Sequence, residues 1–140
     1  IELAENLKLG ESNPAGPRVL FVGPTRETDR AYAAADALLL PTFYDSFGLV
    51  AVEALTHGMP VISTEFLGAG NLITQHHVGT LVATPKHTDE MAAALDALPR
   101  PGTPEHAALA ARARNAGDMM PADVYLDTLE TLYTEISNAK

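Results

Sequence analysis

The 140-residue sequence has no cysteine, no long apolar run and no excess of basic side chains. The missing cysteines exclude a disulfide framework and any metal site built on thiolates. No apolar run reaches the roughly 20 residues that a membrane-spanning helix needs, and the amino terminus lacks the pattern of a signal peptide. These absences leave an ordinary globular domain as the expected class of protein.

The acidic side chains outnumber the basic ones, and the formal net charge is −9. A protein that binds nucleic acid neutralises phosphates with lysine and arginine, so this balance argues against a nucleic-acid partner. Any anionic ligand must instead be bound locally, through backbone amides and a few cations. The five histidines are scattered, none forms an i, i+4 pair, and no acidic cluster offers a ligand set, so we expect neither a metal nor a cofactor.

The length suits one domain, and 46% hydrophobic and 19% charged residues are typical of a globular protein. Short apolar runs alternate with segments of helical periodicity, which predicts an α/β fold, a three-layer Rossmann-like parallel sheet with right-handed crossovers. The predicted strands are 18–22, 37–40, 59–63 and 78–82. The predicted helices are 1–9, 25–35 with Thr25 as its cap, 49–57, 71–75, 87–98, 104–115 with Pro104 in its first turn, and 121–137.

Apolar spacing predicts which helix faces pack inward. For the helix at 49–57 the predicted inner face is Leu49, Val52, Ala54 and Leu55. For the helix at 87–98 it is Met91, Ala94, Leu95 and Leu98. The last helix carries an apolar face that we expect to be only partly covered, so that the chain self-associates at high concentration. That face comprises Val124, Leu126, Leu129, Leu132, Tyr133 and Ile136.

The stretch at 44–53, YDSFGLVAVE, joins the predicted strand at 37–40 to the helix that follows it. In open α/β sheets, ligands bind at such strand-to-helix turns. Gly48 lets a ligand approach backbone N–H groups at a helix N-terminus, where the helix dipole favours an anion. Asp45 and Glu53 bracket this turn with seven residues between them, and their carboxylates suit sugar hydroxyls on either side of a diphosphate. The alternative is an ordinary turn with a capping acid and a surface glutamate.

Three short segments, DSFGLV at 45–50, EAL at 53–55 and GMPVI at 58–62, carry a family resemblance. In this order they resemble the signature of retaining GT-B glycosyltransferases, an E-x7-E motif followed by a G-x-P-V strand. The segments 34–41 and 79–82 continue the pattern, and the resemblance, which covers roughly 18–98, is to the lipopolysaccharide-core glucosyltransferase type. One position departs from the family, because the first acid is Asp45 where glutamate is usual.

The resemblance implies a parent enzyme that transfers a sugar from a UDP- or GDP-sugar to an acceptor hydroxyl with retention. It implies that this chain is the truncated carboxyl-terminal, donor-binding lobe, without the amino-terminal acceptor lobe or the basic residues that clamp the diphosphate. We therefore expect weak donor binding, no complete catalytic set and no activity of the chain alone. The expected location is the cytoplasm, with peripheral membrane attachment of the parent as an open alternative.

The substrate-binding residues implied by the resemblance are Asp45, Ser46, Phe47, Gly48, Leu49, Val50 and Glu53. The amides of Gly48, Leu49 and Val50 would stabilise the leaving diphosphate. Glu53 would bind the ribose hydroxyls, and Asp45 would bind hydroxyls of the transferred sugar.

Two further segments have alternative interpretations. Gly68, Ala69 and Gly70 form either a second anion-binding nest or a flexible turn. Arg26 and Arg30 either meet a base or phosphate or lie on a solvated helix face. Two other function classes also stay open: a non-catalytic Rossmann-like scaffold, and a phosphoacceptor signalling domain, which the scarcity of lysine disfavours. A nucleotide-sugar epimerase is the nearest enzymatic rival, but it has no reason to carry the seven-residue acid spacing.

Overall fold

The computed structural model describes residues 6, 9, 14–15, 18–119 and 122–138, and the side chains of 122–125 are not described. Helix α2 spans Thr28–Ala34, α5 spans Thr88–Asp96, α6 spans Pro104–Gly117 and α7 spans Ala122–Asn138. The helix predicted at 1–9 lies almost wholly outside the described residues. No helix in the described part of the chain is long and apolar enough to cross a membrane.

The sheet consists of three parallel strands in the order β1-β2-β3, namely Leu38–Leu40, Val61–Thr64 and Gly79–Val82. Leu38 is in register with Val61, and Val61 with Gly79. Helix α3 (Leu49–Thr56) connects β1 to β2, and α4 (Gly70–His76) connects β2 to β3. The predicted α/β class, with a parallel sheet and crossover helices, is confirmed.

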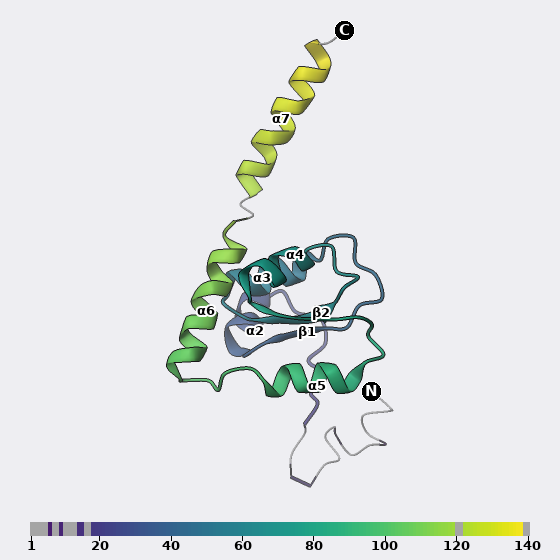
Figure 1. Ribbon diagram of the computed structural model, residues 1–140, viewed down its shortest axis with the longest axis vertical. Helices are drawn as coiled ribbons and strands as arrows, with labels where there is room; N and C mark the ends of the chain where they lie inside the picture. The colour runs from purple at the N-terminus through teal and green to yellow at the C-terminus, as the bar shows by residue number, and fades with distance from the viewer. Residues whose placement is uncertain (1–5, 7–8, 10–13, 16–17, 120–121, 139–140) are drawn as a thin grey trace.

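The helices form a layer on each side of the sheet (Figure 1). Helices α3 and α4 cover one face, α6 packs against both of them, and α5 covers the other face against β2 and β3. Helix α7 projects away from this body, with its carboxyl end at the far tip of the molecule. The predicted three-layer arrangement is therefore present, and α7 stands outside it.

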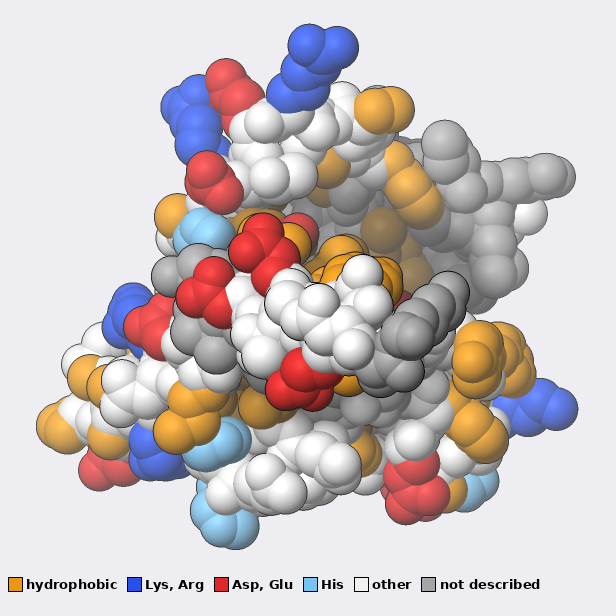
Figure 2. Space-filling model, turned by 90° about the horizontal axis from the view of Figure 1, so that it is seen from above, with side chains coloured by type: hydrophobic (Ala, Val, Ile, Leu, Met, Phe, Trp, Pro, Cys, Tyr) orange, Lys and Arg blue, Asp and Glu red, His pale blue; other side chains and the backbone are white. Residues whose placement is uncertain are grey.

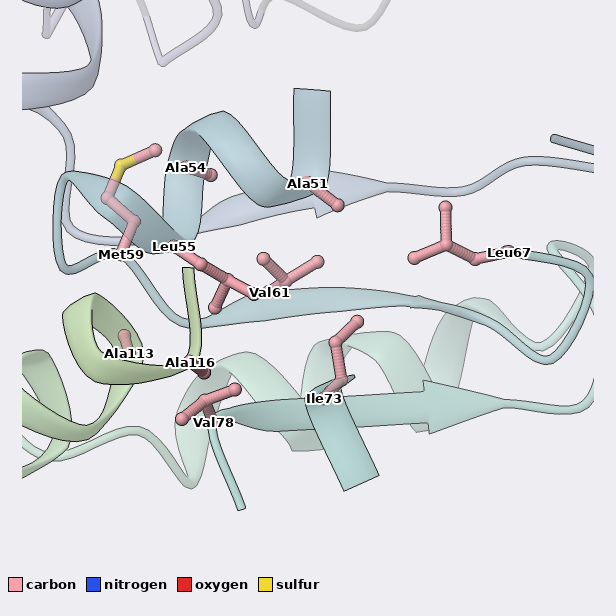
Figure 3. Close-up of a cluster of buried hydrophobic side chains, with 10 residues drawn as sticks. All are labelled: Ala51, Ala54, Leu55, Met59, Val61, Leu67, Ile73, Val78, Ala113 and Ala116. Atoms are coloured by element: carbon pink, nitrogen blue, oxygen red, sulfur yellow. The ribbon is translucent and has the colours of Figure 1, made fainter. Parts of the chain in front are cut away.

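The main hydrophobic core lies between the sheet and the layer formed by α3, α4 and α6 (Figure 3). Small residues let α6 approach α3 closely, since a Cβ on Gly117 would lie 2.6 Å from the backbone nitrogen of Thr56. A second cluster, Ile62, Val82, Met91 and Ala94, fills the other face under α5. The ten residues of the main cluster are Ala51, Ala54, Leu55, Met59, Val61, Leu67, Ile73, Val78, Ala113 and Ala116.

The strand predicted at 18–22 is wrong, because the structure has no strand there. Leu20 and Val22 are 64% and 76% exposed, and the described residues provide no ladder for this segment. A strand needs a neighbour to satisfy its backbone groups. In a doubly wound sheet the strand order is 3-2-1-4-5-6, and β1, β2 and β3 would correspond to strands 4, 5 and 6. The strand before them in the chain would be strand 3, which lies at the far edge of the sheet and not beside β1. The apolar pattern at 18–22 therefore does not predict a strand by itself, because it does not show whether a neighbouring strand is present.

Details of three helices also differ from the predictions. Thr25 is not the cap of α2: its hydroxyl accepts a hydrogen bond from the Glu27 amide, and the helix begins after Glu27. Leu49 is 66% exposed, since the buried face of α3 is formed by Ala51, Ala54 and Leu55. Leu95 is 39% exposed, although its neighbours Met91 and Ala94 on α5 are buried as predicted. The first-turn role of Pro104 is confirmed, with the Thr103 side chain accepting from the His106 amide.

Candidate functional site

The turn at 45–48 lies beyond the carboxyl end of β1, and Gly48 is the N-cap of α3. Gly48 has φ 86° and ψ 57°, in the left-handed region that favours glycine. A Cβ at this position would also lie 2.2 Å from Cδ1 of Leu67, so the packing requires glycine as well. Because the first N–H groups of a helix have no intrahelical partner, the amides at the start of α3 are available to a ligand.

A second loop, which follows β2, holds this turn in place through main-chain hydrogen bonds. The Asp45 amide donates to the Phe66 carbonyl at 3.1 Å, and the Gly68 amide donates to the Asp45 carbonyl at 3.0 Å. The Ala69 amide donates to the Phe47 carbonyl at 2.7 Å. The two loops therefore form a short parallel bridge, and the conformation of the turn does not depend on its side chains alone.

The second anion-binding nest considered for 68–70 is wrong. The amide of Gly68 donates to Asp45, that of Ala69 to Phe47, and that of Gly70 to the Leu67 carbonyl at 3.0 Å. Gly68 is needed for close packing, since a Cβ there would lie 2.1 Å from the carbonyl oxygen of Ser46. The small residues of this loop thus serve the first turn instead of binding an anion themselves.

Asp45 is half-buried, and its Oδ1 accepts a hydrogen bond from the Phe47 amide at 3.2 Å. This contact is a local turn cap of the kind that aspartate commonly makes. An ionised carboxylate has about four acceptor positions, so a second partner is still possible. The structure therefore gives Asp45 a structural role in the turn, and a contact with a sugar stays a prediction.

Glu53 lies in the middle of α3, and its Oε2 accepts a hydrogen bond from the Tyr32 hydroxyl of α2 at 2.8 Å. The ring of Tyr32 packs beside that of His57, with 5.1 Å between the centroids and 32° between the planes. Burial, then the hydrogen bond and charge of Glu53, then the charge of Asp29, raise the pKa of Tyr32 to about 12. The Tyr32 hydroxyl is the donor of this bond, since an ionised carboxylate can only accept.

The profile described as "Glycosyl transferases group 1" matches residues 2–100. The chain belongs to the glycosyl transferases group 1 family. It is 37% identical over 114 residues to D-inositol 3-phosphate glycosyltransferase of Mycobacterium marinum, and this match covers 80% of the chain and 23% of that relative. It is 32% identical over 83 residues to lipopolysaccharide glucosyltransferase WaaG of Escherichia coli K12, which covers 59% of the chain and 22% of WaaG.

Two solved structures share the fold of this group 1 chain. Sucrose-phosphate synthase from Thermosynechococcus elongatus superposes with a TM-score of 0.84 and 25% identity, over 99% of the chain and 34% of the synthase. The crystal structure of WaaG, a glycosyltransferase involved in lipopolysaccharide biosynthesis, gives 0.67 and 31%, over 84% of the chain and 30% of WaaG. The fold is thus that of part of a GT-B glycosyltransferase, and the chain spans between a fifth and a third of the length of these proteins.

Tyr32 and His57 of this group 1 chain were not among the residues singled out from the sequence. Tyr32 lies 21 residues before Glu53, and only the packing of α2 against α3 brings the two together. No local spacing marks such a contact, so the sequence offers no signal for it. Arg30, considered for a base or phosphate, forms an ion pair with Glu27 at 2.7 Å on the exposed surface of α2, which fits the solvated-face interpretation.

A cavity of about 590 Å³ lies at the amino ends of the strands, whereas the turn lies at their carboxyl ends. It is lined at the amino ends of β1 and β2 by Asp36 and Pro60, and by Asp96, Arg100 and His106. It is remote in the fold from the ligand-binding edge of an α/β sheet. Among the described residues, no group of three histidine or acidic side chains is arranged to bind a metal ion.

Proposed function

We propose that this chain is the donor-binding part of a glycosyltransferase, and that the whole protein transfers a sugar from a nucleoside diphosphate sugar to an acceptor hydroxyl with retention. The family assignment supports sugar transfer in general. The observation that carries the location of the site is the start of α3 at Gly48, beyond the carboxyl end of β1 and fixed by the loop at 65–69. This is the place where an α/β sheet binds its ligand.

The chemistry proposed for this site begins with the diphosphate. The amides of Gly48, Leu49 and Val50 donate to its oxygens, and the N-terminal end of the helix dipole, equivalent to roughly half a positive charge, favours the anion. The same donors stabilise the charge that develops on the diphosphate as the sugar leaves. Ser46, Leu49 and Val50 are exposed in the structure, so this surface is accessible to a ligand.

Two acids are proposed to bind the sugars on either side of the diphosphate. Glu53 lies five residues beyond Gly48, about 7.5 Å along the helix axis, and accepts hydrogen bonds from the ribose hydroxyls. Asp45 accepts hydrogen bonds from the transferred sugar with the acceptor positions that its turn cap leaves free. Retention is proposed from the family resemblance of the spacing between these two acids.

Affinity for nucleoside diphosphates tests this proposal. We expect UDP, GDP or ADP to bind the chain with a dissociation constant on the order of 1 mM or weaker, about −4 kcal/mol, because no basic clamp is proposed within it. The matching nucleosides without phosphate should not bind measurably. Glu53→Gln should weaken binding, since a charged acceptor becomes a neutral amide, whereas the control Glu130→Gln on exposed α7 should not. Equal affinity for nucleoside and nucleoside diphosphate would refute the diphosphate site.

A further inference from the structure

The contact between Tyr32 and Glu53 joins two helices that are not adjacent in the chain. Tyr32 of α2 is half-buried and packs against the main core, whereas Glu53 of α3 is exposed. The two are linked by the 2.8 Å hydrogen bond from the Tyr32 hydroxyl to Glu53 Oε2. An exposed glutamate on a helix normally samples several rotamers, and a bond from a fixed donor selects one of them.

The Tyr32 ring is itself held in place by His57. Its ring packs against the His57 ring, and Nδ1 of His57 lies 2.8 Å from the Glu53 carbonyl oxygen. A carbonyl can only accept, so the proton of this bond is on Nδ1. The other ring nitrogen of His57, Nε2, lies 3.6 Å from Oδ1 of Asp29 on α2. The side chain and the main chain of Glu53 are thus both tied to one cluster between α2 and α3.

We infer that Tyr32 is a positioning residue of the donor site, which orients the Glu53 carboxylate to accept hydrogen bonds from both ribose hydroxyls. This inference rests on the proposed function. An ionised carboxylate has about four acceptor positions, and Tyr32 occupies one of them, so two hydroxyls can still donate. Tyr32 is protonated near neutral pH, as a phenol with its ordinary pKa near 10 already is, and the raised pKa of about 12 keeps it so at higher pH.

The expected effect follows from the ordering of Glu53 before the ligand arrives. A side chain that is already ordered does not lose its rotamer freedom on binding. Without the hydroxyl of Tyr32 this ordering occurs in the binding step, and we expect a loss of roughly three- to tenfold in affinity, where tenfold corresponds to about 1.4 kcal/mol. Tyr32→Phe is a suitable variant because it keeps the ring that packs against His57 and removes only the donor.

The experiment compares ribonucleotides with analogues that lack the hydroxyls. The chain, Tyr32→Phe, Glu53→Gln and the double variant are titrated with UDP, GDP and ADP and with the 2′,3′-dideoxy form of each. We expect Tyr32→Phe to weaken binding of the ribonucleotide, to leave the dideoxy form unchanged, and to cause no further loss in the Glu53→Gln background. The control Glu130→Gln, at an exposed position on α7, should match the wild type.

The outcomes separate the two proposals. If the wild type prefers the ribonucleotide and Tyr32→Phe keeps that preference in full, or weakens both forms equally, the positioning role is overturned while the donor site stands. If the wild type binds ribonucleotide and dideoxy form alike, Glu53 does not bind the ribose, and the role of Tyr32 fails while the diphosphate site stands. If the wild type binds neither form, the proposed donor site fails as a whole.

Discussion

The Gly68 amide donates a hydrogen bond to the Asp45 carbonyl at 3.0 Å, and this contact ties the loop after β2 to the turn after β1. The turn carries the proposed diphosphate site, so its shape depends on a residue 20 positions beyond Gly48 in the sequence. The loops beyond the carboxyl ends of two adjacent parallel strands are thus joined by main-chain hydrogen bonds. A preorganised site needs such support, because it tolerates only about 0.5 Å of displacement.

Gly68→Ala should destabilise the fold and displace the turn. A Cβ would lie 2.1 Å from the Ser46 carbonyl oxygen, and backbone must move to relieve the contact. We expect a loss of about 1–3 kcal/mol in the free energy of unfolding, measured by urea denaturation. The control is Gly102→Ala, where φ is 84° but no atom lies within 4 Å, so that only the backbone term of about 1–2 kcal/mol applies. Amide shifts at 45–48 should change for the first variant and not for the second, and unchanged shifts in both would contradict the bracing role.

The Tyr32 phenol should titrate with a pKa of about 12, raised by burial first and then by Glu53. Because the pKa of Tyr32 is higher in the folded than in the unfolded state, its contribution to the free energy of unfolding is present in full below the unfolded pKa near 10. It is lost as the pH rises from about 10 through 12. Glu53→Gln should lower the pKa toward 10, measured from the ring carbon shift of Tyr32, whereas Glu130→Gln should not. A pKa that is the same in the Glu53→Gln variant would show that the hydrogen bond does not form in solution.

The substitutions Asp45→Asn and Asp45→Glu separate capping from sugar binding in the whole glycosyltransferase proposed above. Asparagine keeps an oxygen that can accept from the Phe47 amide, so the turn should persist while the charge is lost. We expect Asp45→Asn to bind the free nucleoside diphosphate like the wild type and to lose transfer. Glutamate reaches about 1.5 Å further, which is large for a preorganised site. Transfer by Asp45→Asn at the wild-type rate would mean that Asp45 only caps the turn.

Helix α7 should mediate self-association of this chain. The apolar side chains of Leu132 and Ile136 are 48% and 56% exposed. Figure 2 views the molecule from above, from the side of α7, and shows acidic and apolar side chains side by side on this side of the molecule. Apolar side chains exposed together on a surface mark a site of protein association.

Sedimentation at rising protein concentration measures this association. Leu132→Glu and Ile136→Glu should each reduce it, since a charge would have to be buried at the contact. The matched control Asn115→Glu adds the same charge at an exposed position of α6 and should leave it unchanged. A strictly monomeric profile at millimolar concentration would contradict the prediction.

Local sequence patterns predicted the elements whose partners are close in the chain. The strands at 38–40, 61–64 and 79–82 and the helices between them follow from alternating apolar runs, and Pro104 marks the start of α6. The segment at 18–22 has an equally good apolar pattern, but a strand forms only with a neighbour, and no local feature shows whether one is present.

The candidate site was predictable to the same extent. The sequence predicts that Gly48 lies at a strand-to-helix turn, and in the structure it is the N-cap of α3. The function of Gly68 and the contact between Tyr32 and Glu53 depend on how separate loops and helices pack, which the spacing of residues does not encode. The exposure of Leu49 was not predictable for a similar reason. The buried face of α3 is formed by Ala51, Ala54 and Leu55, and apolar spacing does not show which apolar positions of a short helix face inward.

A map of amide shifts during titration with a nucleoside diphosphate tests the central claim most directly. The account predicts that the largest shifts occur at Gly48, Leu49 and Val50, with smaller ones at Tyr32 and Glu53, and that they saturate on the order of millimolar ligand. The cavity at the other edge of the sheet, beside Arg100 and His106, serves as the internal control and should not respond. Shifts centred on that cavity, or no shift at Gly48 up to tens of millimolar ligand, would contradict a donor site at the start of α3.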